Sequence, residues 1–224
     1  MKNLYVRILS LLPHFIYKRI DLNKMFQSST LEMIIKKNNI SIELFDGQSE
    51  DFKNFHDKCK IYAEYGCGLS TLYSVDIAKK QTYSVDTDND WVQNIKKNIS
   101  NSSFLNLNYV DVGPTGNWGM PQTYSKRANF KSYLNNIWAY DSKPDFILID
   151  GRFRVASFLT CLKFAESGTI ICFDDYINRK IYHVVEEFEK PFLKNKRQAY
   201  FKVGSRHDPE KIDFVLNKFE YVLI

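Results

Sequence analysis

The sequence predicts an α/β domain with a doubly wound, mostly parallel sheet of seven strands. From residue 61 onward, short β-rich runs alternate with amphipathic helical stretches, which is the pattern of βαβ units. The apolar run 61–65 passes through a Gly-Cys-Gly turn into a helical stretch. A carboxylate stands at the end of each of five predicted strands: Glu64, Asp86, Asp111, Asp150 and Asp174. Because ligands bind beyond the carboxyl ends of such strands, these acids are candidate site residues.

The periodicity places each element in order. Strands are expected near 60–65, 81–86, 106–111, 144–150, 168–174, 197–203 and 219–224, and helices near 69–79, 89–99, 123–139, 153–165, 178–189 and 209–217. Asp88 and Asp208 are predicted N-caps, the second followed by Pro209 in the first turn. The last strand, 219–224, is expected to pair inside the sheet.

The first part of the chain, 1–57, is predicted to be a short helical cap on the main domain, 58–224. Ser-Thr-Leu-Glu at 29–32 is a capping-box pattern that opens a helix to about residue 37, and 41–45 has strand character. The cap either covers the ligand cleft or is purely structural. Its basic, aromatic start packs on the domain or lies on a membrane surface. We expect neither a signal peptide nor a membrane span.

Composition indicates one globular core. The chain has 224 residues, 44% of them hydrophobic, and a net charge of +5. This mildly basic surface tolerates an anionic substrate but lacks the charge density of a nucleic-acid-binding protein. Four scattered cysteines predict reduced thiols and a cytoplasmic location, and a homo-oligomer is compatible with the sequence. The basic residues Lys194, Lys196 and Arg197 are interpreted as protection of an edge strand.

The glycine turn at 66–68 is the predicted cofactor cradle. Gly66 can adopt the positive φ of a sharp turn, and Gly68 lets a ligand approach helix N-terminal amides, with Ser70 or Thr71 as cap. A Walker loop would require Gly-Lys-Ser/Thr, and the third glycine of G-x-G-x-x-G is replaced by Thr71. Glu64 repels a pyrophosphate but suits a ligand with an ammonium and a sulfonium group, such as S-adenosylmethionine.

The run Glu64-Tyr65-Gly66-Cys67-Gly68-Leu69-Ser70-Thr71, followed by Ser84-Val85-Asp86, resembles motif I and the next acidic strand end of class I S-adenosylmethionine-dependent methyltransferases. The resemblance extends from Lys58 to the end of the chain. It implies a Rossmann-like fold, an antiparallel seventh strand and S-adenosylmethionine as cofactor. It also implies that Asp86 binds the ribose hydroxyls. Asp111 either accepts a hydrogen bond from the adenine amino group or stabilises a turn.

The loop 113–121 is rich in glycine and proline and contains Trp118. We expect an ordered lid in which Trp118 covers the adenine or the substrate. The alternative is that this side chain anchors the loop to the core.

Asp150, Asp174 and Asp175 follow two strands that are expected to be adjacent. Like charges so close require a cation, a substrate cation or a shared proton, and Mg²⁺ or Mn²⁺ would accept these oxygen ligands. The layout is similar to that of metal-dependent O-methyltransferases of the catechol type, which have one aspartate after strand four and an Asp-Asn pair after strand five. Here Asp175 replaces the asparagine, and Phe153 stands where that subfamily has a catalytic lysine.

Without a metal, Asp150 or Asp174 would hydrogen-bond the acceptor directly, and His183 would be the base. Arg152 and Arg154 are predicted to bind a phosphate or carboxylate on the acceptor, unless both pair with the neighbouring acids. Two further residues are assigned to the acceptor wall: Tyr176 and Arg179.

The sequence therefore predicts a methyltransferase that acts on a hydroxyl group of a sugar or another small molecule, with metal assistance as an option. The Asn/Asp-Pro-Pro-Tyr/Phe motif of amino-group methyltransferases is missing after strand four, and no cysteine stands there to attack a pyrimidine. One alternative is a non-catalytic cofactor-binding module that works through a protein partner. Another is a nucleotide-dependent oxidoreductase, against which Glu64 and Thr71 argue.

Overall fold

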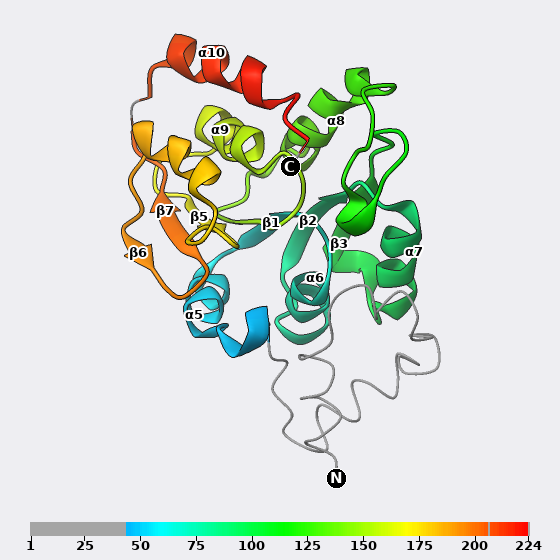
Figure 1. Cartoon of the computed structure of the whole chain (residues 1–224). Coiled ribbons are helices and arrows are strands. Elements are labelled where there is room, and N and C mark those ends of the chain that lie inside the picture. Colours follow the sequence, from blue (N-terminus) through cyan, green and yellow to red (C-terminus); the bar gives the residue numbers. More distant parts are fainter. Residues whose placement is uncertain (1–43, 206, 224) are drawn as a thin grey trace.

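The computed structural model describes residues 44–205 and 207–223 (Figure 1). The predicted helix at 29–37 and most of the predicted 41–45 strand lie outside the described residues. The seven strands form one sheet in the order β3-β2-β1-β4-β5-β7-β6. The predicted α/β class with a mostly parallel, doubly wound sheet is confirmed.

Five adjacent strands of the sheet are parallel. They are β1 (Ile61–Tyr65), β2 (Gln81–Asp86), β3 (Leu105–Tyr109), β4 (Phe146–Ile149) and β5 (Ile170–Phe173). β7 (Ala199–Lys202) runs antiparallel to both β5 and β6 (Leu193–Lys194). β4 is buried at every position, as expected for a strand covered on both faces.

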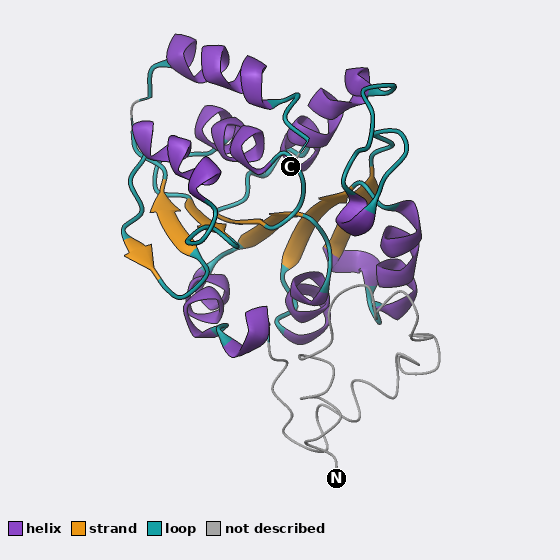
Figure 2. Cartoon of the chain, in the orientation of Figure 1, coloured by secondary structure: helices purple, strands orange, loops and turns teal. Residues whose placement is uncertain are grey.

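Helices cover both faces of the sheet (Figure 2). One face carries α8 (Phe130–Asn135), α9 (Arg154–Phe164), the 3₁₀ segment η7 (Lys180–Glu187) and α10 (Pro209–Phe219). The other carries α5 (Glu50–Lys58), α6 (Leu69–Leu72) and α7 (Asn89–Asn98). The remaining short segments are η1 (Phe45–Gly47), η2 (Tyr73–Ile77), η3 (Ser102–Phe104), η4 (Asn117–Gly119), η5 (Arg127–Asn129) and η6 (Asn136–Trp138). In the described part of the chain, no helix is both long and apolar enough to cross a membrane.

The predicted strand at 219–224 is wrong. Asp208 caps α10 by accepting hydrogen bonds from the amides of Glu210 and Lys211, and the helix continues to Phe219. The short tail after it forms a turn, and Phe219 and Leu223 pack against the core beside α9. The seventh strand is instead β6, two residues long, which pairs with β7 in a hairpin that was predicted only as the strand 197–203.

The predicted helices 89–99, 153–165 and 209–217 agree with α7, α9 and α10 to within about two residues, and the other three differ. The segment predicted as one helix at 123–139 is the six-residue α8 between the 3₁₀ segments η5 and η6. The segment after α6 continues as a π-helix, η2, rather than as an α-helix. The segment predicted as a helix at 178–189 is the 3₁₀ segment η7. Asp88 caps α7 as predicted, since its side chain accepts a hydrogen bond from the amide of Trp91.

α5 belongs to the core of the domain although it lies within the predicted 1–57 segment. Phe52 and His56 are buried against Tyr62 of β1 and Phe146 of β4. The His56 imidazole hydrogen-bonds the hydroxyl of Ser74 at 2.9 Å. Burial, with Lys80 adding to it, lowers the pKa of His56 from its ordinary 6.5 to about 4.

This buried imidazole predicts acid sensitivity. The unfolded chain binds a proton at His56 near pH 6.5 whereas the folded chain does so only near pH 4, so its contribution is complete above pH 6.5 and is lost as pH falls. The free energy of unfolding should decrease by up to about 3 kcal/mol between these pH values. Urea unfolding of wild type and of His56→Gln between pH 6.5 and pH 4 measures this change in the free energy of unfolding. An equally steep pH dependence in the variant would contradict the assignment.

Candidate active site

The glycine turn between β1 and α6 leaves room for a ligand at one glycine and not at the other. Gly66 has φ of 93°, and a Cβ there would lie 2.8 Å from the Cα of Gly151, so only glycine fits. Gly68 has an extended backbone, and a Cβ there would meet nothing within 4 Å. The predicted cradle is therefore open at Gly68.

Glu64 supports this turn from inside the protein. The side chain is 0% exposed, and its carboxylate accepts hydrogen bonds from four hydroxyl groups: those of Tyr62, Ser70, Thr71 and Ser84. Burial raises the pKa of Glu64, and the four donors oppose the shift. The amide of Gly68 donates to the Thr71 hydroxyl at 2.9 Å, which caps α6. The predicted contacts of Glu64, Ser70 and Thr71 with the cofactor would require part of this network to open.

Asp86 ends β2 beside the same turn. Its carboxylate accepts hydrogen bonds from the amides of Cys67 at 2.9 Å, Thr87 at 2.7 Å and Asp88 at 2.9 Å. Burial raises the pKa of Asp86, and these amides oppose the shift. The side chain therefore holds the glycine turn in place, and its contact with a ribose stays a prediction.

The loop 113–121 lies over the end of β2. The Thr87 hydroxyl donates to the carbonyl of Gly119 at 2.7 Å, and Thr115 and Pro121 form a bridge that closes the loop. Trp118 is 55% exposed with φ of 65°, so its side chain does not anchor the loop in the core. An ordered loop with an exposed tryptophan fits the predicted lid.

Asp111 forms an ion pair with Lys126 and accepts a hydrogen bond from the amide of Gly113 at 3.0 Å. The hydrogen bond from Lys126 is the main reason that its pKa is lowered. The side chain thus has the turn-stabilising role that was one of its two predicted roles, and the adenine contact stays a prediction.

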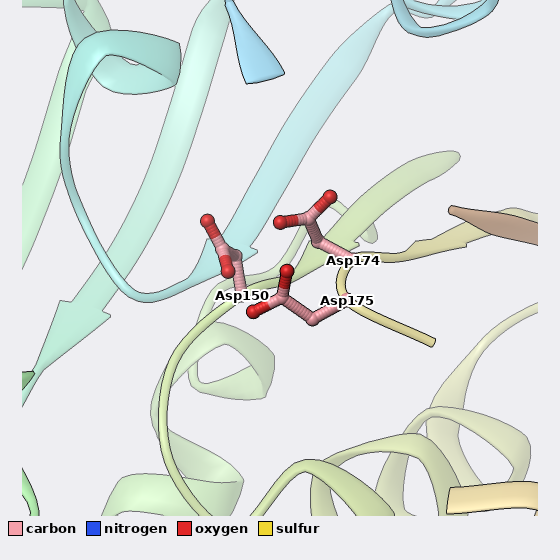
Figure 3. A group of neighbouring side chains, drawn as sticks. All are labelled: Asp150, Asp174 and Asp175. Carbon is pink, nitrogen blue, oxygen red and sulfur yellow. The ribbon is translucent and has the colours of Figure 1, made fainter. Parts of the chain in front are cut away.

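Three carboxylates converge at the ends of β4 and β5, as predicted (Figure 3). Ile149 pairs with Phe173 in the parallel register, which places Asp150 beside Asp174 and Asp175. One ligand oxygen from each residue lies within 4.8 Å of the other two. Asp174 is fully buried, whereas the Asp150 side chain is 36% exposed.

Arg197, in the turn between β6 and β7, forms ion pairs with two of these acids. Its Nε donates to Asp174 Oδ1 at 2.9 Å, and its Nη2 contacts both Asp174 Oδ2 and Asp175 Oδ1, the latter at 2.9 Å. Its Nη1 reaches Asp46 at 2.6 Å. These acids hold the pKa of Arg197 above its ordinary value although burial opposes its charge.

Arg154 is the second cation of the cluster and is only 3% exposed. Its guanidinium lies 3.0 Å from Asp150 Oδ1 and 3.6 Å from Asp175 Oδ2, and it donates to the carbonyls of Gly151 and Asp174. Arg154 therefore links the ends of β4 and β5. Its guanidinium is not available to bind an anionic group of the acceptor, which was the role predicted for it. Arg179 lies at the rim, with Nη2 2.9 Å from Asp175 Oδ2.

A structure search finds a solved structure with a similar fold. A methyltransferase-like protein from Silicibacter pomeroyi matches this chain with 28% sequence identity and a TM-score of 0.72, over 80% of this chain and 96% of that one. The chain has the class I methyltransferase fold. No protein-family model and no curated protein sequence matches it.

Two methyltransferases are more distantly similar to this chain. An RNA methyltransferase from Salinibacter ruber in complex with S-adenosyl-L-homocysteine has 10% identity and a TM-score of 0.44, over 71% of this chain and 92% of that one. An O-methyltransferase from Bacillus cereus in complex with the same ligand has 15% identity and a TM-score of 0.48, over 80% and 92%. These likenesses are too distant to decide which acceptor this methyltransferase fold serves.

The predicted metal site does not fit a divalent ion. Both carboxylate oxygens of Asp174 and of Asp175 already face guanidinium groups, and so does Oδ1 of Asp150. An ion would have to displace Arg197 and would then lie against Arg154. The repulsion that motivated the prediction is relieved by these two arginines, so we derive no step through Mg²⁺ or Mn²⁺.

Asp150 is the acid of the cluster that remains open to a substrate. Among the described residues, its Oδ2 has no ion-pair or hydrogen-bond partner, while Oδ1 pairs with Arg154. Burial, with the charge of Asp174 next in size, raises the pKa of Asp150 to about 8, and Arg154 opposes this shift.

Two predicted residues, Tyr176 and His183, pack against each other. Tyr176 is fully buried and its hydroxyl donates to Glu186 at 3.0 Å, so it does not line an open acceptor wall. His183 stacks on the Tyr176 ring at 4.7 Å between centroids, and its Nε2 lies 3.2 Å from the Tyr176 carbonyl. A carbonyl can only accept, so Nε2 carries the proton; the role of His183 as base stays a prediction.

Sequence reasoning missed two residues of the site. Arg197 was assigned to an edge strand, because nothing near it in the sequence indicates that β7 starts beside the end of β5. Tyr133 of α8 is fully buried, and its hydroxyl accepts a hydrogen bond from the amide of Arg152 at 3.1 Å. Its position in a predicted helix indicated only a core side chain.

If Arg197 neutralises the cluster, its removal should create a cation site. Arg197→Gln should lose about 3 kcal/mol of stability because buried Asp174 loses its partner. It should bind Mn²⁺ at least about tenfold more tightly than wild type, since three carboxylates become available. Titration followed by electron paramagnetic resonance measures the concentration of unbound Mn²⁺ and so gives the affinity of each variant. Lys196→Ala, an exposed neighbour in the same turn, is the control; equal Mn²⁺ affinity in wild type and Arg197→Gln would refute the prediction.

Proposed function

We propose that this protein is an S-adenosylmethionine-dependent methyltransferase that methylates a hydroxyl oxygen of a small molecule, with a sugar as one candidate. The observation that carries the proposal is the open position at Gly68, where a Cβ would meet nothing within 4 Å. In the same glycine turn, the Cys67 amide donates to Asp86, and Gly66 contacts the backbone of Asp150 and Gly151. A cofactor site next to an available carboxylate is what a hydroxyl acceptor requires.

The cofactor would lie over the turn between β1 and α6. S-adenosylmethionine supplies an electrophilic methyl group on its sulfonium. Gly68 would let the ligand approach the backbone closely, and Asp86 would accept hydrogen bonds from the ribose hydroxyls. Trp118 would cover the ligand from the loop 113–121. The Glu64 network below the turn fixes its shape before the ligand arrives, so little ordering remains on binding.

The acceptor would approach from the side of β4 and β5. Asp150 Oδ2 would accept the proton of the acceptor hydroxyl while that oxygen takes the methyl group. Arg154 would hold the Asp150 carboxylate through Oδ1, and Arg197 would keep Asp174 and Asp175 paired behind it. The missing amino-group motif after β4 supports an oxygen acceptor.

Two glycine variants test the cofactor site. Gly68→Val fills open space, so its stability should stay within about 0.5 kcal/mol of wild type, and it should bind S-adenosylhomocysteine at least about a hundredfold more weakly. Gly66→Ala clashes with Gly151 at positive φ and should lose about 2 kcal/mol or more of stability. Calorimetry and urea unfolding measure both quantities. Unchanged ligand affinity in Gly68→Val would exclude this site.

If Asp150 accepts the proton, its substitution should lower methyl transfer without weakening cofactor binding. Asp150→Asn should lower the rate of methyl transfer to hydroxyl acceptors by about a hundredfold or more, because proton transfer of this kind contributes that much. Binding of S-adenosylhomocysteine should be unchanged, and excess chelator should leave wild-type activity intact. Labelled cofactor incubated with a panel of sugars and diols measures transfer. Cofactor binding without transfer to any acceptor would favour a non-catalytic binding module.

A further inference from the structure

We propose that the methyl acceptor carries an anionic group, a carboxylate or a phosphate, which Arg152 binds. This inference rests on the proposed function and names the class of its substrate. Four arginines stand near the acidic edge, and they differ in their partners. Arg154, Arg179 and Arg197 all form ion pairs with the carboxylates there.

Arg152 forms no ion pair within residues 44–205 and 207–223. Its side chain is only partly exposed, and the buried Nε has no hydrogen-bond partner. Buried polar groups are nearly always paired, and an unpaired cation is the most expensive case. A guanidinium in this state is prepared for an oxyanion, which it can bind through two parallel hydrogen bonds.

The surroundings of Arg152 make its charge costly. Burial lowers the pKa of Arg152, and the neighbouring charge of Arg154 adds to this, while Tyr133, Asp150 and Tyr182 act in the opposite direction. The carboxylate of Asp150 lies too far away for an ion pair with it and is engaged by Arg154. An anionic ligand would therefore relieve both the missing hydrogen bond and the repulsion.

The position of Arg152 favours the acceptor as the source of this anion. Arg152 follows Asp150 by two residues, and Tyr182 of η7 stands on the β5 side of the site. Gly68 and Asp86, which would hold the cofactor, lie on the β1 and β2 side. The carboxylate of the cofactor's methionine part has the same chemistry, so the experiment must separate the two sources.

Calorimetric titration with inorganic phosphate and with acetate tests the inference on protein saturated with S-adenosylhomocysteine. Wild type should bind one of these probes with millimolar affinity, and Arg152→Gln should bind it at least about tenfold more weakly. Arg152→Lys should bind with intermediate affinity. Arg127→Gln, which removes an exposed arginine of η5, should match wild type. Because Arg152 forms no ion pair in the described part of the chain and its Nε has no hydrogen-bond partner, its variants should fold about as stably as wild type.

The outcomes separate the possible failures. Absence of probe binding to wild type, or equal binding by Arg152→Gln, would overturn the inference. A tenfold loss of S-adenosylhomocysteine affinity in Arg152→Gln, with probe binding intact, would assign the arginine to the cofactor carboxylate and also overturn it. Failure of wild type to bind S-adenosylhomocysteine at all would instead refute the proposed function.

Discussion

The contact between Gly66 and Gly151 is the constraint on which the site depends. These residues end two neighbouring strands, and a Cβ on either would lie within 3 Å of the other's backbone. The two turns can therefore touch only as glycines. Their contact places the glycine turn after β1 against the backbone of Asp150 and Gly151, which follow β4. In the proposed function, the cofactor on the first turn would therefore lie beside an acceptor on the second.

Hydrogen bonds from hydroxyl groups and backbone amides to two carboxylates stabilise the glycine turn. Glu64 collects four hydroxyl donors from β1, β2 and α6, and Asp86 collects three amides from the turns after β1 and β2. Glu64 is buried and Asp86 is partly buried, and each carboxylate is satisfied by donors, which offsets much of the cost of its charge. The acids at these two strand ends therefore shape the turn, in addition to any contact with a ligand.

The acids at the next two strand ends are balanced by arginines from distant parts of the chain. Arg154 comes from the start of α9 and Arg197 from the β6–β7 turn, and together they engage Asp150, Asp174 and Asp175. A guanidinium matches carboxylates in a fixed planar geometry, whereas a divalent ion needs their free oxygens. The protein thus supplies the counter-charge of this cluster, and Arg152 is the cation that we propose for the substrate.

The sequence by itself determined the order of the central elements and the residues at their ends. Glycine at 66 and 68, the caps Asp88 and Asp208, and the acids after β4 and β5 are local signals that depend on a few neighbouring residues. Only the tertiary structure decided the rest. The 219–224 strand was wrong because α10 continues to Phe219 and the short tail after it forms a turn, from which Leu223 packs against the core. The partners of Asp174 lie 20 and 23 residues away, and antiparallel β7 returning beside β5 brings Arg197 to it, which local patterns do not encode.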